Sequence, residues 1–309
     1  MRRIRHHEHG GPEVLRLEEA DVPEPGPGEL LVRAEAIGVT LPSVRKVRDE
    51  RTALPGVLGG EVAGPVLAVG AGVDDFAVGD RVTSLTLSGS YADVVVAPTF
   101  LASRIPDDAD AVAAVALVRG GHVALAALST GAVAPSDAVL ITGAASGAGH
   151  LAVQLAKLHG VRRVVAAVGS RAKEDFLRGL GADEVVAYDE DDWGEPVDVV
   201  LDGVGGDVLP RALAALAPGG RLVFFGSGGG TVPAYELLAG GKTITGLTMG
   251  RFSVIHRDEY ERHTGELWTY HREGRLKAVV HAEIPLADAA RAHEIIEARA
   301  NLGKVVLRP

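Results

Sequence analysis

The sequence predicts an α/β protein in which a doubly wound parallel sheet is inserted into a second, β-rich domain. Three observations support this fold class. A glycine-rich turn separates an apolar segment, 138–141, from an alanine-rich segment, 150–159. Strand and helix patterns then alternate to about residue 225, as in right-handed βαβ units. Short Val, Ile and Leu runs separated by Gly, Pro and Asp turns occupy both ends of the chain.

The N-terminal part of the chain has the pattern of short strands. Apolar runs at 30–37, 62–69 and 81–84 are bounded by turn residues. From about residue 110 the sequence becomes rich in alanine. We expect helices at 110–117 and 122–128, joined by the turn Arg119-Gly-Gly-His122.

The central part alternates between strand and helix patterns. This order predicts one parallel sheet with helices on both faces. The expected strands are 138–141, 163–168, 184–187, 197–201, 220–225 and 243–249, and the expected helices are 150–159, 171–179 and 207–217.

The C-terminal part returns to the character of the first domain. A polar helix, about 257–272, precedes strands at 278–284 and 304–307, which flank a helix at 286–299. We therefore predict one discontinuous domain and one inserted domain. The first comprises residues 1–118 and 252–309, and the second, which binds a nucleotide, comprises residues 119–251.

The glycine-rich turn predicts a pyrophosphate site. Small residues let the backbone approach phosphate groups, and the unpaired amides at a helix N-terminus bind them. A purely structural tight turn is the alternative, but the strand–turn–helix context favours dinucleotide binding. The residues expected to contact the pyrophosphate are Ser146, Gly147, Ala148 and Gly149.

Composition excludes several classes of protein. The net charge of −10 argues against nucleic-acid binding, because phosphate neutralisation requires an excess of cations. No run approaches the roughly 18 uncharged apolar residues of a membrane span, and the charged N-terminus has no signal-peptide pattern. The chain has no cysteine, which suits a cytoplasmic protein.

The end of the second expected parallel strand favours NADPH over NADH. An NAD site usually has Asp or Glu there, to bind the ribose hydroxyls. This chain instead has Ser170, Arg171 and Lys173, a hydroxyl and two cations suited to a 2′-phosphate. The alternative is an ordinary basic first turn of an exposed helix.

The fourth and fifth parallel strands should also contribute to the site, since ligands bind at the carboxyl edge of such sheets. Gly203–Gly205 follows the fourth strand, and Phe225-Gly-Ser227 follows the fifth. We expect the backbone of Val204, Phe225, Gly226 and Ser227 to lie beside the nicotinamide ribose.

Several motifs in the same order along the whole chain resemble the zinc-free, zeta-crystallin-like quinone oxidoreductases of the medium-chain dehydrogenase/reductase superfamily. The resemblance implies a GroES-like substrate domain, a Rossmann domain with the cofactor between them, and a homodimer paired through 243–249. The motifs are His9-Gly-Gly-Pro-Glu-Val-Leu15, Ala36-Ile-Gly-Val39, Val78-Gly-Asp-Arg-Val82, Gly89-Ser-Tyr-Ala-Asp-Val94, Gly181-Ala-Asp183, Asp202-Gly-Val-Gly-Gly206 and Arg291-Ala-His-Glu-Ile-Ile296.

The resemblance also implies further contacts. Tyr188 would join Ser170 and Lys173 at the 2′-phosphate, and Asn301 and Gly303 would close over the cofactor. The small-molecule substrate would be a quinone or an enone. Tyr91 is expected to be structural, on a strand face.

We expect no metal site. A catalytic zinc needs three protein ligands, commonly Cys and His. Zinc-dependent relatives supply a His in a Gly-His-Glu motif, where this chain has Gly59-Gly60-Glu61, and it has no cysteine. His6, His7 and His9 form a cluster that we interpret as a solvated strand face.

Three residues depart from the family pattern at the expected catalytic centre. Thr40 and Arg45 stand where the family usually has Asn and Tyr. Arg45 stays protonated, so it would bind an anionic substrate group or a developing enolate, or else belong to a solvated loop, 45–48. His122 replaces a small or hydroxyl residue. It is either a proton donor or a packing residue at a helix start.

The leading hypothesis is an NADPH-dependent, zinc-independent reductase of quinones or α,β-unsaturated carbonyl compounds. A biosynthetic enoyl or enone reductase is one alternative. A cofactor-binding interaction protein that has lost catalysis is another, given the departures at the catalytic positions. The short-chain reductase class is excluded because no tyrosine has a lysine four residues later.

Overall fold

The computed structural model describes residues 1–87 and 89–309, which form two compact units. The β-rich unit comprises Met1–Arg119 and Ala278–Pro309, and the second unit comprises Gly120–Lys277. The first division lies beside the expected one at 118/119. The second does not lie at 251/252, because the helix at Arg257–Arg272 and the residues that follow it up to Lys277 belong to the second unit.

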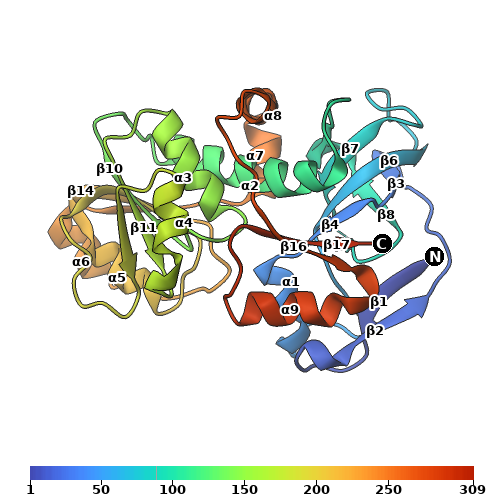
Figure 1. Ribbon diagram of the computed structural model, residues 1–309, viewed down its shortest axis with the longest axis horizontal. Coiled ribbons are helices and arrows are strands. Elements are labelled where there is room, and N and C mark those ends of the chain that lie inside the picture. Colours follow the sequence, from blue (N-terminus) through green and yellow to red (C-terminus); the bar gives the residue numbers. More distant parts are fainter. Residues whose placement is uncertain (88) are drawn as a thin grey trace. The chain divides into compact units, whose positions relative to one another are not determined.

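The β-rich unit has two sheets. One has the order β2-β1-β5, and the other is an eight-stranded mixed sheet with the order β16-β17-β4-β6-β3-β8, in which β7 also pairs with β6, and β9 pairs with β7 (Figure 1). Its strands are β1 (Arg2–His6), β2 (Leu15–Glu19), β3 (Glu29–Arg33), β4 (Ala36–Gly38), β5 (Gly56–Val57), β6 (Glu61–Val69), β7 (Arg81–Leu85), β8 (Val94–Pro98), β9 (Ala102–Arg104), β16 (Val280–Pro285) and β17 (Lys304–Arg308).

Two helices pack on this unit, α1 (Leu41–Arg48) and α9 (Ala289–Glu297). The solvated loop considered for residues 45–48 is therefore wrong. Val44 and Val47 are buried in the core of the unit, which holds these residues in a helix. Arg48 joins α1 to α9 through two hydrogen bonds to Glu297, of 2.8 and 3.0 Å. Single 3₁₀ turns occur at Pro12–Val14, Thr99–Leu101 and Leu286–Asp288.

The second unit contains the expected parallel sheet. Its strand order is β12-β11-β10-β13-β14-β15, and all pairs are parallel. The sheet grows from β10 to one side through β11 and β12 and to the other side through β13, β14 and β15. Every residue of the first strand is buried, which explains its continuous apolar sequence. The strands are β10 (Ala138–Thr142), β11 (Arg163–Val168), β12 (Glu184–Ala187), β13 (Val197–Asp202), β14 (Leu216–Phe224) and β15 (Thr243–Gly246).

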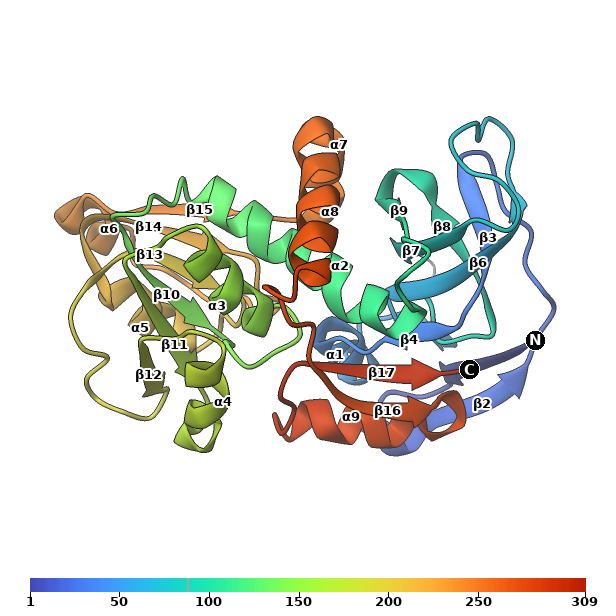
Figure 2. The same ribbon diagram turned by 45° about the horizontal axis from the view of Figure 1, so that its top comes forward.

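The helices of this unit follow the expected positions with small shifts. The expected last strand, 243–249, ends at Gly246, and Met249 already begins a helix. Helices α7 and α8 follow one another, as Figure 2 shows. The helices are α3 (Gly149–Leu158), α4 (Glu174–Gly179, after a 3₁₀ turn at Arg171–Lys173), α5 (Val208–Ala214), α6 (Ala234–Gly240), α7 (Met249–Ile255) and α8 (Arg257–Arg272).

A single helix, α2 (Ala111–Thr130), replaces the two helices and the turn expected at 110–128. The glycines inside it allow close packing rather than a turn. A Cβ on Gly120 would lie 2.6 Å from the carbonyl oxygen of Gly147, and one on Gly121 would lie 2.4 Å from Leu267. In contrast to the sequence-based expectation, α2 is long and apolar enough to cross a membrane. Its apolar window is 83% buried, as in the core helix of a globular protein.

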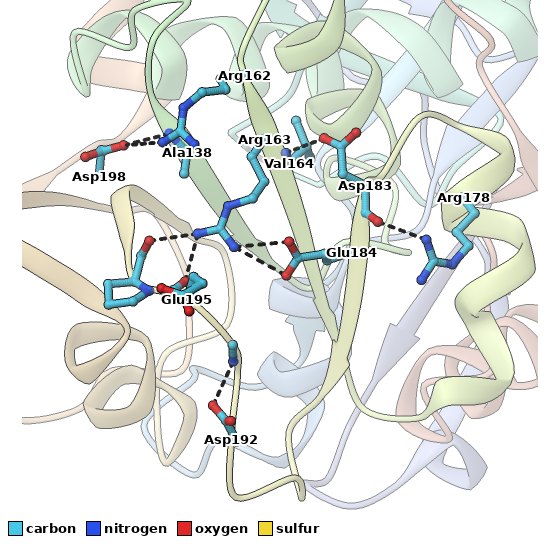
Figure 3. A network of polar contacts seen from close by, with 12 residues as sticks. Ala138, Arg162, Arg163, Val164, Arg178, Asp183, Glu184, Asp192, Glu195 and Asp198 are labelled. Carbon is cyan, nitrogen blue, oxygen red and sulfur yellow. Dashed lines mark hydrogen bonds and ion pairs between the residues drawn. The ribbon is translucent and has the colours of Figure 1, made fainter.

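Ion pairs and hydrogen bonds hold the amino ends of the parallel strands (Figure 3). Arg163, at the start of β11, contacts the Glu184 carboxylate at 3.1 Å and also donates to the carbonyl oxygens of Glu195 and Pro196. The Val164 amide donates to Asp183 at 2.7 Å. This edge is therefore tied together by protein contacts, whereas the expected ligand site lies at the opposite, carboxyl edge.

Candidate functional site

The glycine turn between β10 and α3 forms a backbone cradle. Gly143 has a φ of +60°, a conformation that favours glycine. A Cβ on Gly149 would lie 2.2 Å from the carbonyl oxygen of Gly143, so only glycine permits this approach. Within the described residues, the amides of Gly147 and Ala148 make no intramolecular hydrogen bond. Unpaired amides at the start of a ten-residue helix form an anion site.

Tyr188 fixes this turn. Its hydroxyl accepts a hydrogen bond from the Gly143 amide at 2.6 Å and donates one to the carbonyl oxygen of Ala167 at 3.2 Å. Since Ala167 lies near the end of β11, the hydroxyl joins the ends of two neighbouring strands. The family resemblance implied a contact of Tyr188 with the 2′-phosphate, and the structure shows an additional positioning role.

The candidates for binding a 2′-phosphate lie together after β11. The hydroxyl of Ser170 accepts a hydrogen bond from the Ala172 amide and caps the 3₁₀ turn. The guanidinium of Arg171 forms ion pairs with Glu190 and with Glu174, and these carboxylates raise its pKa. Lys173 is half-buried at the end of the same turn.

The loops after β13 and β14 pack backbone against backbone. A Cβ on Gly226 would lie 2.8 Å from the backbone atoms of Gly203 and Val204, so a side chain at residue 226 would separate the loops. The Phe225 amide donates to the carbonyl oxygen of Asp202 at 2.9 Å. Ser227 is exposed beside them.

Two residues absent from the expected set, Thr142 and Asp202, organise this edge. Asp202 is fully buried, and one of its carboxylate oxygens accepts from the Thr142 hydroxyl at 2.5 Å. The signal in the sequence was a polar residue directly after each of two apolar strands, 138–141 and 197–201.

The position of His122 favours the packing interpretation. It lies inside α2, not at a helix start, and is 1% exposed. Its Nε2 lies 3.0 Å from the hydroxyl of Thr264, and its ring contacts Tyr260 edge-on. Burial, together with the nearby His263 and Arg257, lowers its pKa to about 3. At neutral pH His122 is therefore an uncharged imidazole, which is a poor source of a proton.

The other two expected catalytic residues lie in the β-rich unit. Thr40 is the residue before α1, and its hydroxyl lies 3.2 Å from that of Ser43. Arg45 lies one turn into the same helix and is half-buried. Burial, and then the positive charge of Arg299, lowers the pKa of Arg45. Its position suits the binding of an anionic group, which would relieve both effects.

Asn301 and Gly303 shape the segment before β17. The side-chain amide of Asn301 (Nδ2) donates to the carbonyl oxygen of Gly303 at 2.9 Å. Gly303 has a φ of +84°, and a Cβ there would lie 2.3 Å from the carbonyl oxygen of Val279. The two residues therefore form one local turn that requires glycine.

The segment that replaces the zinc ligand of related dehydrogenases contains a buried charge cluster. Glu61 is 2% exposed and forms ion pairs with Lys304 and, at 3.2 Å, with Arg119. A cation therefore already neutralises this carboxylate. Lys304 and Arg119 were not identified from the sequence, because they are far from Glu61 along the chain.

Two further expectations concern residues away from these groups. Tyr91 is buried, and its hydroxyl lies 3.1 Å from Nε2 of His293, in agreement with a structural role. The solvated face expected for the N-terminal histidines is wrong for His6. This side chain is fully buried; its ring lies against Gly56 of the neighbouring strand β5, and its Nδ1 contacts the carbonyl oxygen of Glu8.

Comparison with known proteins identifies the family. Residues 26–107 match the alcohol dehydrogenase GroES-like domain, and residues 147–266 match the family described as zinc-binding dehydrogenase. Quinone oxidoreductase 1 of Escherichia coli K12 is 32% identical over 326 residues, covering 99% of both chains. A 2-haloacrylate reductase of a Burkholderia species is also 32% identical, covering 98% of this chain and 97% of the relative.

A mycobacterial protein solved in complex with NADPH has a TM-score of 0.92 and 37% identity, with complete coverage of both chains. The fold is thus a GroES-like domain combined with a Rossmann domain. The chain belongs to the medium-chain dehydrogenase/reductase superfamily, and within it to the quinone oxidoreductase branch.

Proposed function

We propose that this protein is an NADPH-dependent, zinc-independent reductase that transfers hydride to a quinone or an α,β-unsaturated carbonyl compound. The observation that carries the proposal is the backbone cradle at Gly143–Gly149, combined with the cations of the 170–173 segment. The NADPH complex of the mycobacterial relative supports the same cofactor.

The residues present fit a dinucleotide. The amides of Gly147 and Ala148 would hold the pyrophosphate, and Ser170, Arg171 and Lys173 would hold the 2′-phosphate. Glu190 and Glu174 already pair with Arg171, so these carboxylates compete with the phosphate for its guanidinium. The backbone of Val204, Phe225, Gly226 and Ser227 would line the nicotinamide side, and Asn301 and Gly303 would complete the site.

Bound NADPH would supply the hydride. The side chains of this protein would then orient the acceptor and deliver a proton. The Thr40 hydroxyl donates a hydrogen bond to the acceptor oxygen, and Arg45 stabilises negative charge that develops there. His122 is buried and neutral, so the proton reaches the acceptor through Thr40 or from water. Conjugated acceptors need no Lewis acid, because they delocalise the developing charge themselves.

A second candidate is the reduction of small unsaturated carboxylates. The Burkholderia relative is a 2-haloacrylate reductase. In this chain Arg45, a fixed cation, replaces the neutral tyrosine that the family resemblance led us to expect. A carboxylate acceptor would match that charge.

The proposal is tested by measuring NADPH oxidation against a panel of quinones, neutral enones, enoyl thioesters and unsaturated carboxylates. Turnover of at least one class is expected. Tight NADPH binding without turnover of any acceptor would instead support a cofactor-binding interaction protein. Metal analysis of the active protein should find less than stoichiometric zinc.

The cofactor preference has its own test. In Lys173→Ala, the preference for NADPH over NADH should fall about tenfold or more, through loss of a charge-assisted contact. Arg162→Ala is the control, because this exposed arginine pairs with Asp198 at the amino edge of the sheet. An unchanged preference in Lys173→Ala would contradict the assigned phosphate site.

The proposal also includes a cytoplasmic homodimer. Strand β15 is the last strand of its sheet, and Tyr235 and Leu238 on the neighbouring α6 are 76% and 77% exposed. An edge strand beside exposed apolar side chains suits pairing with a second copy. Light scattering should give twice the mass of one chain, and Leu238→Glu should shift the protein towards monomer.

A further inference from the structure

Thr142 and Asp202 meet at the carboxyl ends of two neighbouring parallel strands. Ile141 of β10 pairs with Leu201 of β13, so the next residue on each strand leaves the sheet at the same level. The Thr142 hydroxyl donates to Oδ1 of Asp202 at 2.5 Å and accepts from the Gly203 amide at 3.1 Å. Thr142 is 2% exposed and Asp202 is fully buried.

The remaining hydrogen bonds of the Asp202 side chain go to the loop that follows it. The Val204 amide donates to Oδ1 at 2.9 Å, and the Gly205 amide contacts both carboxylate oxygens at 3.2 and 3.3 Å. Three consecutive amides, at residues 203 to 205, are therefore fixed by this pair. The carbonyl oxygen of Asp202 also accepts from the Phe225 amide, which adds the loop after β14.

A buried carboxylate is costly unless it is fully hydrogen-bonded. Here the Asp202 carboxylate accepts hydrogen bonds from the loop amides, which also fixes the direction in which the loop carbonyl groups point. Thr142 is also the last residue before Gly143, which begins the glycine turn. One side-chain pair thus connects the pyrophosphate turn to the loop expected beside the nicotinamide.

We propose that the Thr142–Asp202 pair is a positioning device, which holds the Gly203–Gly205 loop in register with the glycine turn so that the nicotinamide half of NADPH is bound in one orientation. This inference rests on the proposed NADPH site. It assigns a role to two residues that themselves need not touch the cofactor.

The position of the pair predicts which half of the cofactor depends on it. The adenosine 2′-phosphate is assigned to the 170–173 segment, whereas the hydrogen bonds of the pair go to the 203–205 loop. Breaking the bridge should therefore weaken binding of whole NADPH and leave binding of 2′,5′-ADP, which lacks the nicotinamide half, nearly unchanged.

The experiment compares Thr142→Val, which removes the hydroxyl at constant shape, with Thr142→Ser, which restores it. Dissociation constants for NADPH and for 2′,5′-ADP are measured by titration, together with kcat, KM and thermal unfolding. Thr83→Val is the matched control. Thr83 is a buried threonine of the β-rich unit, and its hydroxyl donates to the carbonyl oxygen of Val62 at 3.1 Å.

In Thr142→Val the dissociation constant for NADPH should rise about tenfold, from loss of a hydrogen bond to a buried charged group, while that for 2′,5′-ADP changes less than about twofold. Thr142→Ser should recover most of the affinity, and Thr83→Val should match the wild type. If Thr142→Val does not fold, Asp202→Asn is used with the same expectation.

Unchanged NADPH binding in Thr142→Val, or equal weakening of both ligands, would overturn the inference and leave the proposed function intact. A wild-type protein that binds 2′,5′-ADP and NADPH equally weakly would overturn the proposed function itself.

Discussion

Lys304 and Glu61 form an ion pair in the interior of the β-rich unit. Their side chains are 8% and 2% exposed, and Arg119 is a second cation, 3.2 Å from the same carboxylate. Burial lowers the pKa of Lys304, and the attraction of Glu61 opposes this shift. The pair joins β6 to β17 at the place where zinc-dependent relatives have their Gly-His-Glu motif.

Removing one partner of this pair should destabilise the protein strongly. We expect Lys304→Met to lower the free energy of unfolding by roughly 3 kcal/mol, since it removes one of the two cations that the described residues place beside the buried Glu61. Arg308→Met is the control on the same strand, because its ion pair with Glu283 is exposed and 3.8 Å long, so the loss should stay below about 1 kcal/mol. Urea unfolding measures both values, and equal losses would contradict a special role for the buried pair.

Acid should destabilise the Rossmann unit through His122. Its pKa is lowered from 6.5 to about 3 on folding, mainly by burial. As the pH falls below about 6.5, the unfolded chain binds a proton that the folded chain does not bind. The contribution of His122 to the free energy of unfolding is thus fully present above about pH 6.5. It decreases by about 1.4 kcal/mol per pH unit as the pH falls towards 3.

The variant His122→Gln should remove this part of the pH dependence. Unfolding experiments between pH 7 and pH 4 should give a shallower slope for His122→Gln than for the wild type. Parallel slopes for the two proteins would contradict a lowered pKa of His122.

The two glycines of α2 should differ in their effect on the cofactor. A Cβ on Gly120 meets the backbone carbonyl of Gly147, so Gly120→Ala should displace the pyrophosphate turn and weaken NADPH binding about tenfold or more. A Cβ on Gly121 meets the end of the Leu267 side chain, which can move. Gly121→Ala should therefore lower the melting temperature and leave the NADPH dissociation constant near the wild-type value. The reverse pattern would contradict this packing.

Arg45 should distinguish acceptors by charge. If Arg45 binds an anionic group, Arg45→Gln should lower kcat/KM for a 2-haloacrylate by about 10- to 100-fold, because a charge-assisted contact is lost. The value of kcat/KM for neutral quinones should change little. Arg48→Gln, one turn further along α1 and paired with Glu297, is the control. Equal losses with charged and neutral acceptors would mean that Arg45 supports α1 rather than the substrate.

Local patterns predicted most of the Rossmann unit. The strands at 163–168 and 184–187 have the predicted bounds, and the predicted parallel pairing of the central strands is confirmed. The glycine turn was predicted because its sequence signal, small residues between a buried strand and a helix, is contained in a few neighbouring residues.

Two wrong predictions of local structure, the turn at 119–122 and the loop at 45–48, share one cause. Gly120 and Gly121 predicted a turn, yet they are the points where α2 is approached closely by Gly147 and Leu267, and these partners are far away in sequence. Likewise, residues 45–48 have a polar sequence, but Val44 and Val47 pack into a core formed by residues that precede and follow the inserted unit in the sequence.

The sequence by itself determined the alternation of strands and helices, the glycine cradle and the cations of the 170–173 segment. All of these depend on residues within one or two turns of the chain. Only the tertiary structure decided that His122 is buried and neutral, that Lys304 pairs with Glu61, and that Thr142 binds Asp202. Charge and hydrogen bonding act over a few ångströms in space, and the distance between two residues in the sequence does not fix that separation.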